Sequence, residues 1–269
     1  MTLSEAISLL KDAGVENPEF DARELFVHFG NFKRHELVSR SIVLDDEIIE
    51  PKLQERIKRV PLQYIIGSTG FYRESYKVTK DCLIPREDTE ILVDFAVNNI
   101  PEGENFIDLC TGSGCIAIST LCNTKKTNCV AIDISQAALF IAEENAKTNG
   151  VSDRIELRCA DALHFCPPKK VFAVLSNPPY VTESEYNELS PELYYEPKIA
   201  LVGRDEGLEF YKRIVPMSKS SLKPSGFIAF EIGNSQAEAL RKIAEENEMS
   251  AEILTDFSGN ARVAVLKNL

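Results

Sequence analysis

Four consecutive residues, Asn177-Pro178-Pro179-Tyr180, carry the clearest chemical signal in the sequence. They follow an apolar run at 171–175 that is typical of a buried parallel strand. Prolines have no N–H, so Pro178 and Pro179 offer only carbonyl acceptors. The proline after Asn177 favours an extended backbone there, which lets the Asn177 side-chain carbonyl and a neighbouring main-chain carbonyl point the same way. With the Tyr180 ring beside them, these acceptors suit a planar –NH₂ group.

A second stretch, Gly112-Ser113-Gly114-Cys115-Ile116-Ala117, fits the G-x-G-x-x-A dinucleotide pattern between a predicted strand and a predicted helix. Asp133 follows the next strand, where a ribose-binding acid is expected. Both features suit any adenosine-bearing cofactor, so a nicotinamide-dependent dehydrogenase has to be considered. Acceptors for an –NH₂ group have no evident use in hydride transfer, whereas a transferase needs them to place a nitrogen before an electrophilic carbon. S-adenosylmethionine supplies such a carbon, which favours a methyltransferase.

The predicted cofactor contacts lie at the carboxyl ends of strands, where open α/β sheets bind ligands. Asp108 and the loop from Thr111 to Gly114 would meet the amino-acid end of the cofactor. Asp133 would accept from the ribose, and Asp161 and Ala162 would lie beside the adenine. Asp108 could equally be a loop acid that is hydrogen-bonded to local backbone.

These arguments predict one site with two parts and no metal. The predicted cofactor-binding residues are Asp108, Cys110, Thr111, Gly112, Ser113, Gly114, Asp133, Ile134, Asp161, Ala162 and Asn177. The predicted substrate-binding residues are Asn177, Pro178, Pro179 and Tyr180, of which Asn177, Pro178 and Tyr180 are also assigned to catalysis.

The pattern of apolar residues predicts an α/β domain around this site. From residue 105 onward, strand-like runs alternate with helical segments, which indicates a parallel sheet. The predicted strands are at 105–109, 129–132, 155–159, 171–175, 226–231, 251–254 and 261–266. A short turn at 256–260 favours an antiparallel final pair. We therefore predict a mostly parallel, Rossmann-like sheet of seven strands with an antiparallel last strand.

The residues before this domain have a different character. Residues 1–60 have helical periodicity and no chemical motif, so they predict a small all-α domain that is a candidate partner-binding module. The segments 61–67 and 71–78 resemble two short strands around a turn at 67–70, so we predict a β-hairpin linker over 61–84. The cofactor-binding domain then occupies 85–269.

The composition narrows the classes of function. The net charge of −12 argues against a protein that grips a nucleic-acid backbone broadly. The seven cysteines form no Cys-x-x-Cys pair and are expected to be reduced, in a cytoplasmic protein. No signal segment and no apolar run of about 18 residues is present, so no membrane partner is expected. A monomer is the default expectation.

The sequence resembles the HemK/PrmC-type release factor glutamine methyltransferases across nearly the whole chain. The resemblance rests on Pro61-Leu62-Gln63-Tyr64-Ile65-Ile66-Gly67, Leu83-Ile84-Pro85-Arg86 with Asp88-Thr89-Glu90, Asp108 with the glycine loop, Asn177-Pro178-Pro179-Tyr180, and Glu231-Ile232-Gly233. It implies a class I fold that uses S-adenosylmethionine to methylate N5 of the glutamine in the Gly-Gly-Gln loop of peptide-chain release factors. It also implies that the N-terminal bundle helps to hold that protein partner.

Two positions depart from the family pattern, and rival functions remain. Cys110 and Val202 stand where the family usually has glycine.

An adenine-N6 DNA or RNA methyltransferase would use the same Asn-Pro-Pro-Tyr nook for an exocyclic amine, although the acidic composition argues against it. A non-enzymatic module that docks on a translation factor is the third possibility, and the intact cofactor glycines argue against it.

Overall fold

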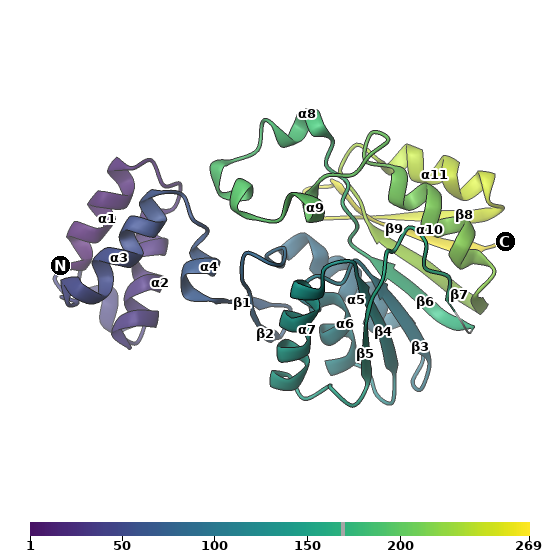
Figure 1. Cartoon of the computed structure of the whole chain (residues 1–269), viewed down its shortest axis with the longest axis horizontal. Coiled ribbons are helices and arrows are strands. Elements are labelled where there is room, and N and C mark those ends of the chain that lie inside the picture. The colour runs from purple at the N-terminus through teal and green to yellow at the C-terminus, as the bar shows by residue number, and fades with distance from the viewer. Residues whose placement is uncertain (168–169) are drawn as a thin grey trace. The chain divides into compact units, whose positions relative to one another are not determined.

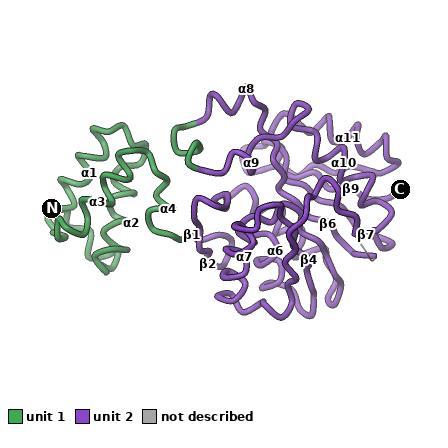
Figure 2. The backbone as a smooth tube through the Cα atoms, in the orientation of Figure 1, with its two compact units in different colours: residues 1–68, 190–195 green, residues 69–189, 196–269 purple. Residues whose placement is uncertain are grey.

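The computed structural model describes residues 1–167 and 170–269 and divides the chain into two compact units (Figure 2). The first unit comprises Met1–Ser68 together with Ser190–Tyr195, and the second comprises Thr69–Leu189 together with Glu196–Leu269. The chain therefore leaves the second unit after Leu189, contributes one short segment to the first unit and returns at Glu196. Every helix of the described residues is too short or too polar to cross a membrane.

The first unit packs short helices around one apolar core. Leu25 and Phe26 of one helix are fully buried in it with Leu53 of another. The helical periodicity predicted for residues 1–60 is therefore present. The helices are α1 (Leu3–Asp12), α2 (Pro18–Gly30), α3 (Asp46–Ile57) and α4 (Leu62–Ile66), with 3₁₀ turns η1 (Glu36–Val38) and η3 (Pro191–Tyr195).

The strand predicted over 61–67 was wrong, because this segment forms helix α4. The Pro61 carbonyl accepts from the amide of Ile65 at 3.2 Å, and Gly67 ends the helix in the left-handed conformation at φ 83°. Leu62 and Ile65 are both buried in the core of the first unit, which is helical spacing. The β-branched isoleucines favoured a strand, but the proline and glycine that flank the run are the stronger, helical signals.

A hairpin does follow, with its turn later than predicted. Its strands are β1 (Ser68–Phe71) and β2 (Glu74–Lys77), which form a separate two-stranded sheet. The two-residue connection includes Tyr72 at φ 58°, and the amide of Tyr72 donates to Oε1 of Glu90 at 2.7 Å. The side chain of Glu90, which lies outside the hairpin, thus stabilises a turn that contains no glycine.

Inside the first unit, Glu192 of η3 binds two arginines that follow one another on the chain. Oε1 of Glu192 accepts from Arg56 Nη2 at 3.0 Å and from Arg59 Nε at 2.7 Å, and Oε2 accepts from Arg59 Nη2 at 2.9 Å. Nε of Arg56 also donates to the buried carboxylate of Asp21 at 2.6 Å. Bidentate arginine–carboxylate pairs are among the stronger ion pairs, so they fasten η3 to the helices.

The second unit contains the predicted seven-stranded sheet, in the order β5-β4-β3-β6-β7-β9-β8. Neighbouring pairs from β5 to β7 are parallel, and β9 runs antiparallel to both β7 and β8. The prediction of a mostly parallel sheet with an antiparallel last strand is confirmed. The strands are β3 (Asn105–Leu109), β4 (Asn128–Asp133), β5 (Ile155–Cys159), β6 (Val171–Ser176), β7 (Leu222–Glu231), β8 (Met249–Thr255) and β9 (Ala261–Asn268).

Helices cover both faces of this sheet (Figure 1). Alternate residues of each strand point to opposite faces, so Ala173 and Leu175 enter one core and Val174 enters the other. The first core holds residues from α5 (Glu90–Asn99), α6 (Cys115–Cys122) and α7 (Gln136–Thr148), and the second holds residues from α10 (Glu209–Lys219) and α11 (Ala237–Glu246). Two shorter helices, α8 (Glu183–Tyr186) and α9 (Lys198–Leu201), follow β6.

Candidate active site

A cavity of about 510 Å³ lies at the carboxyl ends of β3 to β6 in the second unit. The order of strands reverses between β3 and β6, and open α/β sheets bind their ligands at such a reversal. Its volume falls within the range of sites for small molecules and cofactors, roughly 300–1,000 Å³. Fold and sequence therefore place the candidate site at the same edge of the sheet.

The cavity brings together eight of the predicted residues. These are Cys110, Gly112, Asp133, Ile134, Asp161, Ala162, Asn177 and Pro179. The other predicted residues lie outside the cavity lining: Asp108 is in β3, and Thr111, Ser113, Gly114, Pro178 and Tyr180 are in the same loops as the residues that line it.

The loop between β3 and α6 takes a positive φ at three alternate residues. Cys110 has a φ of 61°, Gly112 of 55° and Gly114 of 84°. A Cβ at Gly114 would lie 2.8 Å from Ile118 Cδ1 in α6 and 3.2 Å from Ala142 Cβ in α7. The absence of a side chain at Gly114 therefore lets α6 and α7 pack closely. A residue with a Cβ adopts this conformation at a cost of roughly 1–2 kcal/mol. Cys110 bears that strain where the resembled family usually has glycine.

Asp133, at the end of β4, is held by backbone amides on both carboxylate oxygens. Oδ2 accepts from the amide of Gly112 and Oδ1 from the amide of Ser135, each at 2.8 Å. Burial raises the pKa of this carboxyl above its ordinary value. Each oxygen keeps a second lone pair, so Asp133 can also accept from hydroxyls in the cavity. Asp161 is oriented in a similar local way, with Oδ2 2.8 Å from Nδ1 of His164.

Asp108 is completely buried beneath the loop and is only half satisfied. Its Oδ2 accepts from the Thr111 hydroxyl at 2.6 Å and from the amide of Ala117 at 3.3 Å. Within the described residues, Oδ1 is buried and has no hydrogen-bond donor. Burial raises the pKa of Asp108 to about 7. Both sequence alternatives are thus partly present, since one oxygen is locally bonded and the other is left for a further donor.

The nook around Asn177 is built from side chains that are distant in sequence. Nδ2 of Asn177 donates to the Thr89 hydroxyl at 3.3 Å, and that hydroxyl donates to Oε2 of Glu231. The Tyr180 hydroxyl donates to Oε1 of the same carboxylate at 3.2 Å. Within residues 1–167 and 170–269, the Asn177 side-chain oxygen has no donor, so it remains available where Asn177 lines the cavity.

Two glycines let a second loop press against the Pro-Tyr segment. A Cβ at Gly203 would lie 2.4 Å from the Pro179 carbonyl oxygen, and one at Gly207 would lie 2.1 Å from the Tyr180 carbonyl oxygen. The amide of Gly203 also donates to the Val181 carbonyl at 3.0 Å. These contacts explain why Gly203 and Gly207 are glycines, although the neighbouring position 202 tolerates valine.

Two wall segments of the cavity were missed by the sequence predictions. One runs from Asp81 to Leu83, and the other includes Pro197, Ile199 and Phe210. The buried carboxylate of Glu196 joins them, because Oε2 accepts from the amide of Ile84 at 3.0 Å and Oε1 pairs with Arg86. The Leu-Ile-Pro-Arg motif at 83–86, next to the first wall, carried the family resemblance in the sequence. The resemblance assigned no role to this motif.

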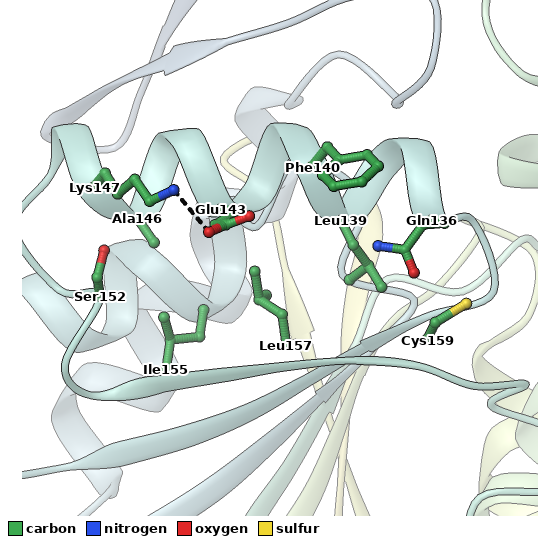
Figure 3. A pocket seen from close by; sticks show the side chains of 10 residues that line it. All are labelled: Gln136, Leu139, Phe140, Glu143, Ala146, Lys147, Ser152, Ile155, Leu157 and Cys159. Carbon is green, nitrogen blue, oxygen red and sulfur yellow. Dashed lines mark hydrogen bonds and ion pairs between the residues drawn. The ribbon is translucent and has the colours of Figure 1, made fainter.

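A smaller hollow of about 360 Å³ lies between α7 and β5 (Figure 3). Leu139 and Leu157 face each other across it, and its lysine and glutamate, Lys147 and Glu143, pair with one another at 2.7 Å. One helix, one edge strand and their connection form all of its walls. The cavity at the strand ends holds the predicted residues and is therefore the candidate active site. Among the described residues, no group of three or more His, Cys, Asp or Glu residues could hold a metal ion.

Comparison with known proteins adds family matches to this geometry. Residues 2–67 match the PrmC N-terminal domain family, and residues 87–196 match the methyltransferase small domain family. The release factor glutamine methyltransferase of Fusobacterium nucleatum is 36% identical over 98% of this chain and 77% of that protein. The enzyme of the same name from Thermodesulfovibrio yellowstonii is 37% identical over 92% of this chain and 91% of its own length.

Longer relatives and solved structures give coarser information. The chain spans about half the length of the bifunctional methyltransferases of Rickettsia that it also matches, for example 56% of the Rickettsia conorii protein. The ribosomal protein L11 methylase of Lactobacillus delbrueckii aligns with a TM-score of 0.52 at 20% identity, over 71% of this chain and 83% of that chain. This likeness shows the fold alone.

Proposed function

We infer the reaction from one premise: this chain belongs to the release factor glutamine methyltransferase family. We propose that it transfers a methyl group from S-adenosylmethionine to the N5 amide nitrogen of the glutamine in the Gly-Gly-Gln loop of peptide-chain release factors, and so modulates translation termination. The proposal combines the family with the chemistry of the cavity.

One observation carries the assignment of the reacting group. Asn177 lines the cavity with its nitrogen bound to Thr89 and its oxygen without a donor. An acceptor oxygen next to Pro178 and Pro179, which have no N–H, suits a group that brings N–H bonds. A primary amide is such a group, and glutamine supplies it.

The residues of the cavity also fit the cofactor. When bound, S-adenosylmethionine supplies a methyl carbon that its sulfonium makes electrophilic. Asp133 would accept from the ribose hydroxyls, and Asp161 and Ala162 would contact the adenine. Asp108 lies in β3, outside the cavity lining and beneath the loop that carries Gly112, and from there its donor-free oxygen would favour the ammonium of the cofactor's amino-acid end. The remaining predicted contacts lie close by: Cys110, Thr111, Ser113 and Gly114 are in the loop with Gly112, Ile134 follows Asp133, and Asn177 follows β6.

The chain's own residues act mainly by positioning. The Asn177 side-chain oxygen and the Pro178 carbonyl would hold the two N–H bonds of the glutamine amide, while the Tyr180 ring packs on its plane. Such orientation can supply ~7–11 kcal/mol in favourable cases. The same acceptors favour the positive charge that develops on nitrogen during transfer. No general base is assigned, because the methylated nitrogen is acidic enough to lose its proton to water.

The first unit is assigned to the protein partner. Its match to the PrmC N-terminal domain family and its lack of a chemical site support a role in holding the release factor. A cytoplasmic monomer fits this role, since the release factor is met there as a separate protein. The formal charge of −12 supports a protein partner over a nucleic acid.

A labelled-methyl assay tests the proposal. Purified protein is incubated with labelled S-adenosylmethionine and a bacterial release factor, with the loop Gln→Ala variant of that factor and adenine-containing DNA as controls. We expect label in the release factor and none in its variant or in the DNA. Label in the DNA alone would support the adenine-N6 alternative. Cofactor binding without any transfer would support a binding module that docks on a translation factor.

A further inference from the structure

Glu231 is a buried carboxylate whose place in the fold the reaction above leaves unexplained. Its side chain is 3% exposed, and it forms no ion pair with any described residue. Burial raises the pKa of Glu231 to about 7. The charge of nearby Arg262, which pairs with Asp88 and Asp256, offsets only part of this rise in pKa. A buried acid without a direct ion pair costs free energy that an apolar side chain would not. Groups of this kind cluster at functional sites.

The two oxygens of Glu231 are taken by two different parts of the nook. Oε2 accepts from the Thr89 hydroxyl, and Oε1 accepts from the Tyr180 hydroxyl at 3.2 Å. Because the Thr89 hydroxyl donates its proton to Glu231, its oxygen can only accept from Nδ2 of Asn177, which is 3.3 Å away. When Glu231 is ionised, the direction of every bond in this chain is therefore set from the carboxylate outward.

The backbone of Glu231 is also held, by a hydrogen bond from a buried tyrosine. The Glu231 carbonyl and Oε1 of Gln236 share the single proton of the Tyr211 hydroxyl, and each oxygen lies 3.1 Å from the hydroxyl oxygen. Nε2 of Gln236 lies 3.4 Å from the Tyr180 carbonyl. Glu231 thus lies between these buried contacts and the two side chains, Asn177 and Tyr180, that are assigned to the substrate.

We propose that Glu231 is the positioning residue of the substrate nook: through Thr89 it fixes the Asn177 amide with its oxygen free for the substrate, and directly it fixes the Tyr180 ring. The proposal rests on the proposed function, since it names what holds the groups assigned there to the glutamine amide. The Glu-Ile-Gly motif of the sequence and the Thr of the Asp-Thr-Glu motif thereby gain a role at the site. Neither residue touches the substrate itself.

The matched variants are Thr89→Val and Thr89→Ser. Valine keeps the branched shape and removes the oxygen that Asn177 needs, whereas serine keeps the hydroxyl. We expect Thr89→Val to lower kcat about tenfold, the factor for one hydrogen bond of ordinary strength. KM for the release factor and Kd for the cofactor should stay within about twofold, and Thr89→Ser should restore kcat to within about twofold.

A second readout needs no substrate. In ¹⁵N-labelled protein, the side-chain amide signal of Asn177 is identified by its loss in Asn177→Ala. We expect slow exchange of one Nδ2 proton in the wild-type protein and in Thr89→Ser, and fast exchange in Thr89→Val. Glu231→Gln is the second variant, should Thr89→Val not fold. Its Nε2 would donate to Thr89 and compete with Asn177, so the protection should again be lost.

The outcomes separate this inference from the proposed function. Unchanged protection of Asn177 in the variants would overturn the inference whatever the substrate is. A parallel fall in kcat and rise in KM that serine does not rescue would also overturn it, because it would indicate general disruption. If the wild-type protein transfers no methyl group to the release factor, the proposed function fails and the exchange data still decide how Asn177 is held.

Discussion

The two halves of the candidate site are built in opposite ways. At the cofactor end, Asp133 is held by the amide of Ser135, two residues away, and by the amide of the glycine loop. At the substrate end, Asn177 depends on Thr89, 88 residues away from it, and Thr89 depends on Glu231, which is 142 residues away from Thr89. One half is positioned by its own loops, and the other by side chains that only the complete fold brings together.

Because of this difference, the two halves of the site should respond differently to substitutions. A site held by local backbone amides keeps its geometry as long as its own strand and loop form. A site held by distant side chains depends on every contact between the elements that carry them. Substitutions in the first half should therefore change affinity for the cofactor, and substitutions in the second should change turnover.

The largest effect is expected for Asn177→Ala, which removes the side-chain acceptor altogether. Loss of one preorganised group that stabilises developing charge costs ~10²–10³ in kcat. Cofactor affinity should change by less than about threefold, because Asp133 and Asp161 are untouched. Steady-state kinetics with a separate binding titration measures both values. Turnover like that of the wild-type protein would remove Asn177 from the mechanism.

Gly203→Ala should come next, because its Cβ would lie 2.4 Å from the Pro179 carbonyl oxygen. Forcing an atom into such a contact typically costs ~1–3 kcal/mol, and here it displaces the substrate half. We expect lower thermal stability and lower turnover. Gly70→Ala is the matched control, since a Cβ there meets nothing within 4 Å. Equal behaviour of the two variants would show that the contact has no importance.

Asp133→Ala probes the cofactor half. It removes the acceptor of two backbone amides, of Gly112 and Ser135, and the group assigned to the ribose. A loss of ~1–3 kcal/mol corresponds to roughly 5–150-fold weaker cofactor binding. Turnover at saturating cofactor should fall by less than about threefold. A fall in turnover with unchanged affinity would reverse the comparison between the two halves.

The smallest expected effect is a pH dependence at Asp108. Its folded pKa of about 7 lies above the unfolded value of 3.8, because burial favours the neutral acid. The stability that this preference contributes is complete below the unfolded pKa and is lost as the pH rises towards the folded pKa. Relative to Asp108→Asn, the wild-type protein should lose about 1 kcal/mol per pH unit between about pH 4.5 and 6.5. Urea titrations across this range test the difference, and a constant gap would contradict it.

The same contrast explains what could be predicted from sequence. The strands, the glycine loop and Asp133 were predictable because each is specified by residues close together in the chain. Thr89 entered the sequence analysis only as part of the Asp88-Thr89-Glu90 motif, yet its hydroxyl binds Glu231, a contact that no local pattern encodes. The strand predicted at 61–67 failed because β-branched residues were weighted above the proline and glycine that end the run. Gly203 was visible as a residue, but its reason, the nearby Pro179 carbonyl, is a property of the fold.

The membership of Ser190–Tyr195 in the first unit has a consequence for synthesis of the chain. The polypeptide is made from its N-terminus, so Arg56 and Arg59 emerge long before their carboxylate partner, Glu192. Glu192 lies 133 residues after Arg59, and at ~5–20 residues per second the synthesis of that stretch takes on the order of ten seconds. The first unit is therefore synthesised first but completed late. During that interval Arg56 and Arg59 lack the carboxylate of Glu192.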